Sequence, residues 1–296
     1  MNNNIQLLTF NDSSQQGDRL AKRLDIPHLS IDLHCFPDGE SLITLPTELN
    51  EHVILYRSLN QPNEKITELI LVSKTLRQRG VKRITLIAPY LCYMRQDIEN
   101  HPGEVVSQKI IGQLFGGLFD DVITVDSHLH RISKLNEAIP LKNAINILAT
   151  DPIVEFLHKK FDELVILGPD SESKQWVEEI ANKIGCQFAV ANKQRTGDKE
   201  VKVTLPDHNF KNKNIVIVDD MASTGRTISL AAAQLNTAGA QTVNALVTHA
   251  LFMGDAKQFL IKNGVTSIWS TDTISDETNV IALDKIIADT FRQIVD

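Results

Sequence analysis

Short apolar runs alternate with longer segments of helical periodicity along the whole chain. The runs are apolar at consecutive positions, which is typical of strands that are buried on both faces of a parallel sheet. We expect strands at residues 5–10, 53–56, 84–88, 122–125, 164–167, 215–218, 243–247 and 266–269. We expect helices at residues 16–24, 64–79, 104–114, 152–160, 172–184, 226–238, 255–262 and 283–295. This alternation predicts an α/β protein with parallel sheets.

The pattern of strand ends occurs twice, which indicates two similar domains. Strands end at Pro89 and Asp126 in the first half, and at Pro169 and Asp219 in the second. The second pair is more widely spaced, and the polar segment at residues 191–209 accounts for the extra length as an inserted loop. The expected domains are residues 1–145, with a C-terminal helix at 281–296 packed against them, and residues 146–280.

Composition limits the partners of the chain. The 296 residues include 30 basic and 37 acidic side chains, and the net charge of −7 opposes non-specific attraction to nucleic acid or to an anionic membrane. The N-terminus lacks the basic and apolar regions of a signal peptide, and no apolar run reaches the roughly 18 residues of a membrane span. We therefore expect a cytoplasmic protein that binds neither nucleic acid nor membranes.

The segment "VIVDDMASTGRT", residues 216–227, carries the clearest candidate chemistry. In an open parallel sheet, ligands bind beyond the carboxyl ends of the strands. The small residues lead into a helix, whose first amide groups favour a phosphate. Asp219 and Asp220 would repel that phosphate, so they would accept hydrogen bonds from sugar hydroxyls or hold a hydrated cation. A strand end with a helix cap explains part of the string, but the full order favours a phosphorylated sugar.

This segment resembles the phosphoribosyl pyrophosphate loop shared by phosphoribosyltransferases and ribose-phosphate pyrophosphokinases. Five more stretches are similar to the pyrophosphokinase family, in the family's order: "CFPDGES" at 35–41, "APYLCYMRQD" at 88–97, "VDSHLHR" at 125–131, "GPD" at 168–170 and "NKQR" at 192–195. The resemblance spans nearly the full length. It implies two phosphoribosyltransferase-like domains, each a mostly parallel sheet flanked by helices. The implied activity is that of a transferase, which moves the diphosphoryl group of ATP to the anomeric hydroxyl of ribose 5-phosphate. The products are 5-phosphoribosyl 1-diphosphate, for nucleotide biosynthesis, and AMP.

The resemblance also implies roles for individual residues. The catalytic residues are Lys193 and Arg195, which a mobile loop would bring onto the transferring phosphates. The implied ATP-binding residues are Phe36, Asp38, Gly39, Glu40, Arg95, Gln96 and Asp97. The implied ribose 5-phosphate-binding residues are Arg195, Asp219, Asp220, Ser223, Thr224, Gly225, Arg226 and Thr227. The implied ligands of the cofactor Mg²⁺ are His128 and Asp170.

The first of these segments has two interpretations. "FPDGE" offers Phe36 as a stacking surface, with Asp38 and Glu40 as acceptors for the adenine amino group. In the family this segment reaches the ATP site of a neighbouring subunit, which implies a homodimer or a larger homo-oligomer. Pro-Asp-Gly is also a strong turn signal, so a plain hairpin turn is the simpler alternative.

Three departures from the commoner family pattern point to its shorter, archaeal-type branch. The glycines that usually follow the S-P-D motif are absent from "GPDSESKQW", Ser223 replaces an Asp, and Arg226 replaces a Gly. Two other classes remain open, a phosphoribosyltransferase and a catalytically silent subunit that regulates a true synthetase. Against them stand the two halves of the chain, and the presence of the lysine, the histidine and the sugar acids.

Overall fold

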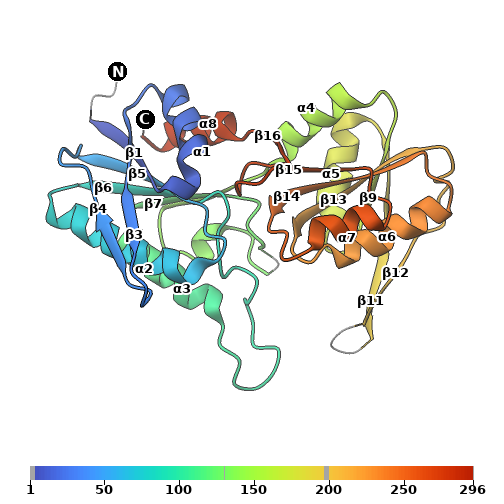
Figure 1. Ribbon diagram of the computed structural model, residues 1–296, viewed down its shortest axis with the longest axis horizontal. Coiled ribbons are helices and arrows are strands. Elements are labelled where there is room, and N and C mark those ends of the chain that lie inside the picture. Colours follow the sequence, from blue (N-terminus) through green and yellow to red (C-terminus); the bar gives the residue numbers. More distant parts are fainter. Residues whose placement is uncertain (1–3, 130, 197–199, 296) are drawn as a thin grey trace. The chain divides into compact units, whose positions relative to one another are not determined.

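The computed structural model describes residues 4–129, 131–196 and 200–295, with side chains described throughout except at residues 194–201. The chain divides into two compact units (Figure 1). Unit 1 runs to Ile147 and resumes at Asp284, whereas unit 2 covers Leu148–Leu283. Each unit is built on one sheet of six parallel strands.

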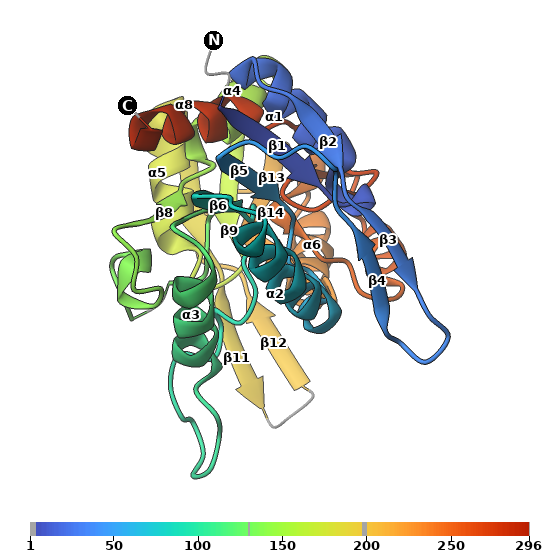
Figure 2. The same cartoon turned by 90° about the vertical axis from the view of Figure 1, so that its left-hand side faces the viewer.

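Unit 1 is a parallel sheet between two pairs of helices. Its strands, in spatial order, are β2 (His28–Ser30), β1 (Ile5–Thr9), β5 (His52–Tyr56), β6 (Arg83–Ile87), β7 (Asp121–Val125) and β8 (Asn143–Ile147). Its helices are α1 (Ser14–Leu24), α2 (Pro62–Gln78), α3 (Ser107–Leu118) and α8 (Asp284–Val295), with short 3₁₀ turns at Asn11–Ser13 and Leu135–Glu137. Helices α1 and α8 pack together on one face, and α2 and α3 lie on the other (Figure 2). A hairpin of β3 (Asp32–Cys35) and β4 (Ser41–Thr44) extends beyond the sheet.

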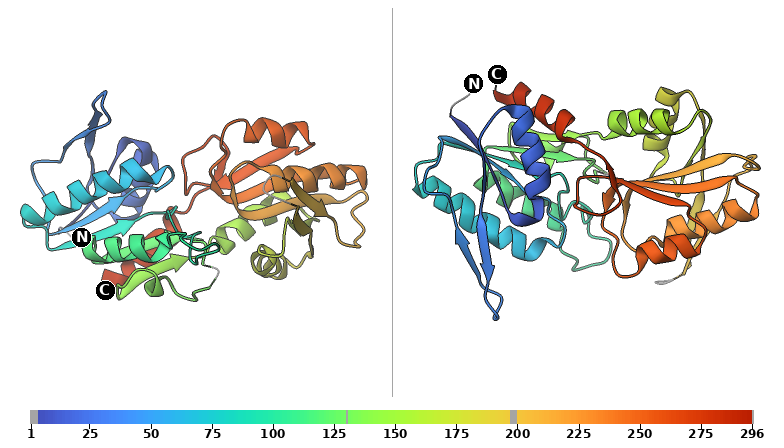
Figure 3. Two further views of the ribbon diagram at one scale, coloured as in Figure 1. Left: turned by 90° about the horizontal axis from the view of Figure 1, so that it is seen from below. Right: turned by 45° about the horizontal axis from the view of Figure 1, so that its top comes forward.

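Unit 2 repeats this arrangement. Its strands, in spatial order, are β10 (Gln187–Val190), β9 (Val165–Gly168), β13 (Asn214–Ala222), β14 (Thr242–Ala250), β15 (Ser267–Thr271) and β16 (Asn279–Ile281). Helices α4 (Thr150–Lys160) and α5 (Lys174–Ile184) cover one face, and α6 (Arg226–Thr237) and α7 (Ala256–Lys262) cover the other (Figure 3). An antiparallel ribbon of β11 (Asn192–Thr196) and β12 (Glu200–Thr204) comes between β10 and β13.

The two units share one topology, and this corrects the repeat that the sequence suggested. Numbered along the chain within each unit, the sheet strands lie in the order 2-1-3-4-5-6 in both. A two-stranded ribbon separates the second and third sheet strands in each unit. The strand before Pro169 therefore corresponds to β1, and the strand that carries Asp219 corresponds to β5, whereas the strands before Pro89 and Asp126 are β6 and β7. Two domains were predicted, but with the wrong strands paired.

The predicted strands and helices are all present, with ends shifted by a few residues. Every residue of β1, β5 and β7 is buried, as expected for strands covered on both faces. The strands that the pattern missed are the outer ones, β2, β8, β10 and β16, and the two ribbons, whose positions are partly exposed. Among the described residues, no helix is long and apolar enough to cross a membrane.

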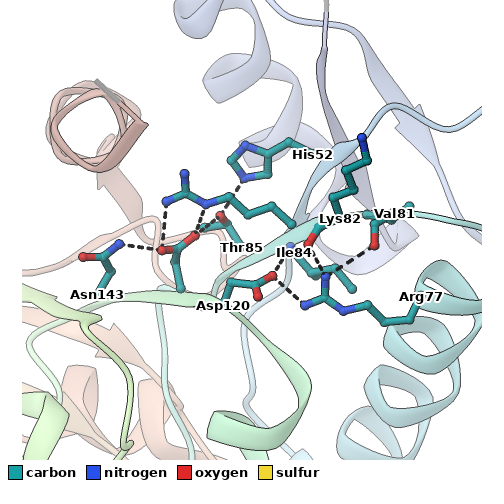
Figure 4. A network of polar contacts seen from close by, with 10 residues as sticks. His52, Arg77, Val81, Lys82, Ile84, Thr85, Asp120 and Asn143 are labelled. Atoms are coloured by element: carbon teal, nitrogen blue, oxygen red, sulfur yellow. Dashed lines mark hydrogen bonds and ion pairs between the residues drawn. The ribbon is translucent and has the colours of Figure 1, made fainter.

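A polar network secures the amino ends of the strands in unit 1 (Figure 4). Asp121 accepts hydrogen bonds from Arg83 at 2.8 and 3.0 Å, from Thr85 at 2.9 Å and from Asn143 at 2.7 Å. The His52 ring lies 2.8 Å from the Thr85 hydroxyl. Because the Thr85 proton goes to Asp121, the His52 ring is the donor in that contact. These contacts fix the amino edge of the sheet, opposite the edge where parallel sheets bind ligands.

Candidate active site

The two adjacent acids lie inside strand β13 and not beyond its end. The sequence predicted a strand that stops at Asp219, but β13 continues to Ala222, and Asp219 pairs in register with Val247 of β14. Neighbouring residues of a strand point to opposite faces, so Asp219 and Asp220 leave the strand on different sides. Asp220 is buried, with 8% of the residue exposed, and Asp219 is half-buried.

Residues 223–227 turn the chain sharply from β13 into α6, as the sequence predicted. Gly225 has φ +66°, which favours glycine, and a Cβ atom there would lie 3.1 Å from Cγ of Leu260. Helix α6 begins at Arg226, and Thr224 and Arg226 are exposed, whereas Ser223 and Thr227 are half-buried. No side chain caps this helix among the described residues. The first amide groups of α6 are therefore suited to an anionic ligand.

Asp170 lies just past the end of β9 and is held by three donors. Its Oδ1 accepts the backbone N–H groups of Glu172 at 3.1 Å and Ser173 at 3.3 Å. Its Oδ2 accepts a hydrogen bond from Nζ of Lys193 at 2.8 Å. The Lys193 side chain is 20% exposed and that of Asp170 is 12% exposed. The structure therefore brings a predicted catalytic lysine and a predicted metal ligand into one partly buried ion pair.

Lys193 and Arg195 are on strand β11, which corrects the prediction that they occupy an irregular loop. Strand β11 pairs with β12, with Lys193 opposite Val203 and Arg195 opposite Val201. Residues two apart on a strand share one face, so the ribbon directs both positions to the same side. The side chain of Arg195 lies outside the described side chains.

The carboxyl groups of Asp219, Asp220 and Asp170 lie close enough to interact electrostatically. Burial raises the pKa of Asp219 well above its usual range, and the neighbouring carboxylates of Asp220 and Asp170 raise it further. An ionised carboxylate in this place needs a partner that donates hydrogen bonds or carries positive charge. Sugar hydroxyls and a hydrated cation both meet that requirement.

The candidate nucleotide residues 36–40 form the tip of the β3–β4 hairpin. Phe36 N–H donates to the Glu40 carbonyl at 2.8 Å, and Gly39 N–H donates to the Phe36 carbonyl at 2.9 Å. Gly39 has φ +93°, and Glu40 N–H donates to Oδ1 of Asp38 at 3.2 Å. The turn indicated by Pro-Asp-Gly is confirmed. Its side chains are exposed, and Phe36 has 42% of its surface accessible.

Arg95, Gln96 and Asp97 lie in an irregular segment between β6 and α3 of the same unit. Arg95 is exposed, and the Gln96 amide donates to the Ile98 carbonyl at 3.0 Å. The Asp97 side chain is 6% exposed, and its Oδ1 accepts a hydrogen bond from Arg131 at 2.7 Å. Its Oδ2 is buried and has no hydrogen-bond partner within the described part of the chain.

Arg131 is a polar residue of this region that was not predicted from the sequence. Arg131 is the last residue of the "VDSHLHR" stretch, and its positive charge at this position was the one feature of the sequence that could have indicated a role. The ion pair with Asp97 places it beside the R-Q-D segment, about 34 residues away in the chain.

The predicted metal ligands belong to different units. His128 follows β7 in unit 1 and is half-buried, whereas Asp170 is in unit 2. Within residues 4–129, 131–196 and 200–295, no three His, Cys, Asp or Glu side chains gather to form a metal site. A joint role for His128 and Asp170 therefore stays a prediction.

Comparison with known proteins decides the family. Residues 5–117 match the N-terminal domain of ribose phosphate pyrophosphokinase, and residues 141–283 match the phosphoribosyl transferase domain. The ribose-phosphate pyrophosphokinase of Methanopyrus kandleri is 30% identical over 286 residues, which cover 96% of this chain and 97% of that protein. That of Saccharolobus solfataricus is 32% identical over 275 residues, with 90% and 92% covered.

The chain belongs to the ribose-phosphate pyrophosphokinase family. The resemblance drawn from six short motifs is confirmed, and the relatives named here are archaeal, as the departures from the commoner pattern predicted. The fold also matches phosphoribosylpyrophosphate synthetase from Mycobacterium smegmatis, with a TM-score of 0.81, 24% identity and 99% of both chains covered. The predicted fold, two phosphoribosyltransferase-like domains with parallel sheets flanked by helices, is thereby confirmed.

Proposed function

We propose that this chain is a ribose-phosphate diphosphokinase, which converts ATP and ribose 5-phosphate into 5-phosphoribosyl 1-diphosphate and AMP. The observation that carries the proposal is the Lys193–Asp170 ion pair in the unit that also holds the acids of β13 and loop 223–227. Unit 2 thus contains a cation for the phosphoryl oxygens, acceptors for the sugar hydroxyls and a helix N-terminus suited to a phosphate. The whole-length similarity to named pyrophosphokinases supports the same assignment.

The sugar phosphate binds to unit 2 in this proposal. Residues 223–227 hold the 5-phosphate with their amide and hydroxyl groups, and the Arg226 side chain adds a positive charge. Asp219 and Asp220 accept hydrogen bonds from the ribose hydroxyls. The raised pKa of Asp219 supports this role, because donors from a ligand would stabilise a carboxylate that the free protein leaves poorly compensated.

The transfer itself requires alignment and charge neutralisation. The anomeric oxygen attacks the β-phosphorus of ATP and loses its proton, while the bond from that phosphorus to the α,β-bridging oxygen breaks and AMP departs. Lys193, assisted by Arg195, stabilises the charge that develops on the phosphoryl oxygens. Lys193 must leave Asp170 to do so, and its place on a two-stranded ribbon gives it one defined side from which to approach.

ATP binds to unit 1 residues in this proposal. Phe36 stacks on the adenine, and Asp38, Gly39 and Glu40 surround it at the hairpin tip. Arg95 contacts the phosphates, and Gln96 and Asp97 supply polar groups to the nucleotide. The buried, unpartnered Oδ2 of Asp97 supports a contact with a ligand donor.

The resident cation in this proposal is Mg²⁺, which would neutralise charge on the ATP phosphates when bound. Asp170 fits this ion, because its Oδ2 already accepts a cationic group at 2.8 Å and the neighbouring carboxylates favour positive charge. Mg²⁺ usually keeps several waters and takes only one or two carboxylates, together with substrate phosphates. A site with few protein ligands is therefore sufficient, and His128 contributes through water.

The domains in this proposal are residues 1–145 with the C-terminal helix 281–296, and residues 146–280, whereas the two compact units change over at Ile147 and at Leu283. We further infer a homodimer or larger homo-oligomer in which the hairpin tip contributes to a neighbour's ATP site. The exposure of Phe36 and of Leu42, at 42% and 53%, supports a role for this hairpin in contacts outside its own unit. The cytoplasmic location stays a prediction.

Positional labelling of ATP tests the reaction. With label on the γ-phosphate, the proposal predicts that label enters the sugar product, and with label on the α-phosphate it predicts labelled AMP. Transfer of a single phosphoryl group would leave labelled ADP and would contradict the proposal. A phosphoribosyltransferase would instead require 5-phosphoribosyl 1-diphosphate and a base, and a silent subunit would transfer no label.

A further inference from the structure

A buried hydrogen-bond network joins the end of β14 to the turn after β15, and it involves none of the proposed substrate-binding residues. Thr273, in the turn after β15, donates its hydroxyl proton to the Thr248 carbonyl at 2.8 Å. Its oxygen lies 2.9 Å from Nδ1 of His249. Because the hydroxyl proton is already used, Nδ1 of His249 carries the proton in this contact. The exposed fractions of Thr248, His249 and Thr273 are 3%, 1% and 1%.

The network fixes the end of strand β14. Thr271 also donates its hydroxyl to the Thr248 carbonyl, at 2.6 Å. The Thr248 carbonyl thus accepts two side-chain hydrogen bonds. Buried polar groups with several partners define one conformation, since any shift would leave donors or acceptors unpaired.

The segment that follows β14 contacts the loop proposed to bind the sugar phosphate. Phe252 N–H donates to the Ala222 carbonyl at 2.9 Å, and Met253 N–H donates to the Ser223 carbonyl at 2.8 Å. Phe252 has φ +28°, an unfavourable conformation for a residue with a side chain. Such a conformation persists only where surrounding contacts hold it in place.

A second set of contacts, at the surface, links the turn after β15 to the segment that follows β14. Lys257 Nζ lies 3.1 Å from Asp276 and 2.7 Å from Glu277, in the turn between β15 and β16. The same ammonium group lies 5.9 Å from the centre of the Phe252 ring. The turn after β15 is therefore tied to residues 248–257 at a buried point and at an exposed one.

We propose that Thr273 and His249 are positioning residues, which hold segment 251–253 so that its amide groups fix the carbonyl groups of Ala222 and Ser223. The inference rests on the proposed function, because it assigns ribose 5-phosphate to loop 223–227. The network acts through the loop and touches neither the substrate nor the reacting atoms. Its contribution is to present the loop in one conformation, which lowers the ordering cost of binding.

The test compares two hydroxyl deletions in the same region. Thr273→Val removes the hydroxyl from the network. Ser270→Ala removes a buried hydroxyl from β15 whose contacts go to Thr278 at 2.8 Å and Asn279 at 2.9 Å, away from β14. For Thr273→Val we expect faster hydrogen exchange at the amides of Phe252 and Met253, and an affinity for ribose 5-phosphate that is weaker by about 3- to 10-fold, with ATP affinity unchanged. Thr273→Ser should restore both, and Ser270→Ala should change neither.

Each outcome decides the proposal. Unchanged exchange at Phe252 and Met253 in a folded Thr273→Val protein would overturn it, as would an equal loss of sugar affinity in Ser270→Ala. If Thr273→Val does not fold, Thr273→Ala replaces it as the hydroxyl deletion, and unchanged exchange in that variant would overturn the proposal. If the wild-type protein binds no ribose 5-phosphate, the proposed function fails, and the exchange contrast alone decides the positioning role.

Discussion

Nζ of Lys193 lies 2.8 Å from Oδ2 of Asp170, so the proposed catalytic lysine forms an ion pair with the proposed metal ligand. The pair joins the β11–β12 ribbon to the end of β9 and neutralises one of the three acids near β13. Phosphate oxygens of ATP would compete with Asp170 for the same ammonium group. The position of Lys193 is therefore one from which substrate binding can recruit it.

Replacing Lys193 by Ala should lower kcat by about 10²-fold or more, with little change in the dissociation constant of ribose 5-phosphate. A cation that acts on the transition state contributes to rate and not to ground-state binding. Steady-state kinetics and calorimetric titration of the sugar phosphate measure the two quantities separately.

Lys202→Ala is the matched control for that experiment. Lys202 lies on β12 of the same ribbon, is exposed and pairs with residue 194, so it faces away from the side that Lys193 occupies. We expect nearly normal turnover. A similar loss in both variants would mean that the ribbon, and not the Lys193 ammonium group, is responsible.

Asp219→Asn should weaken sugar binding and stabilise the free protein. At pH 7 the unfolded chain ionises Asp219 freely, whereas burial, Asp220 and Asp170 raise its pKa in the folded chain. Ionised Asp219 therefore destabilises the fold as the pH rises above 3.8, and the amide removes this penalty. We expect a higher melting temperature without ligand, together with ribose 5-phosphate binding that is weaker by about 10-fold or more.

Melting curves and calorimetry with both substrates check that prediction. ATP affinity should be nearly unchanged, because the acids serve the sugar. Unaltered sugar affinity in the folded Asn variant would contradict the role of Asp219, and relief of the defect by excess Mg²⁺ would assign it to the cation instead.

Phe36→Ala should raise KM for ATP by about 5-fold or more, because stacking of a base on an aromatic ring contributes about 1–3 kcal/mol. KM for ribose 5-phosphate should stay unchanged. Leu42→Ala provides the comparison, since Leu42 is exposed on β4 of the same hairpin. Equal effects of the two substitutions would indicate a general role of the hairpin and not adenine stacking.

His52 should make stability depend on pH in a defined window. Burial, reinforced by Arg83, lowers its pKa from 6.5 to about 4 in the folded chain. Between these values the unfolded state binds more protons, so stability falls as the pH falls from 6.5 towards 4, by up to about 1.4 kcal/mol per pH unit from this residue.

The same unfolding experiment on His52→Gln isolates the effect. Glutamine keeps an N–H donor for Thr85 but does not titrate, so the variant should lose less stability than the wild type between pH 6.5 and pH 4. Parallel pH dependences for the two proteins would remove His52 as the cause.

Hydrophobic pattern was sufficient for the buried elements and insufficient for the exposed ones. Strands such as β5 and β7 bury every residue and leave a continuous apolar run. Strands β3 and β4 have only exposed and half-buried positions, and the ribbon β11–β12 is rich in charged residues, so neither ribbon produces such a run. The two ribbons lie at equivalent places in the two units, so they would have aligned the two halves of the sequence correctly. Because the hydrophobic pattern did not reveal them, the sequence comparison paired the wrong strands.

Local motifs predicted which residues belong to the candidate site, but they did not predict which residues these contact. The turn at Gly225 and the tip at Gly39 follow from adjacent residues. The ion pairs Lys193–Asp170 and Arg131–Asp97 join positions 23 and 34 residues apart, which no local pattern specifies. The extension of β13 past Asp219 depends on pairing with β14, because Met221 and Ala222 find partners in His249 and Ala250.

The most direct measurement is the formation of AMP from ATP by the purified protein, with and without ribose 5-phosphate in the presence of Mg²⁺. We expect AMP only when the sugar phosphate is present, in a one-to-one ratio with 5-phosphoribosyl 1-diphosphate, and we expect Lys193→Ala to abolish most of its formation. AMP formation that does not depend on ribose 5-phosphate, or none at all with both substrates bound, would contradict this expectation.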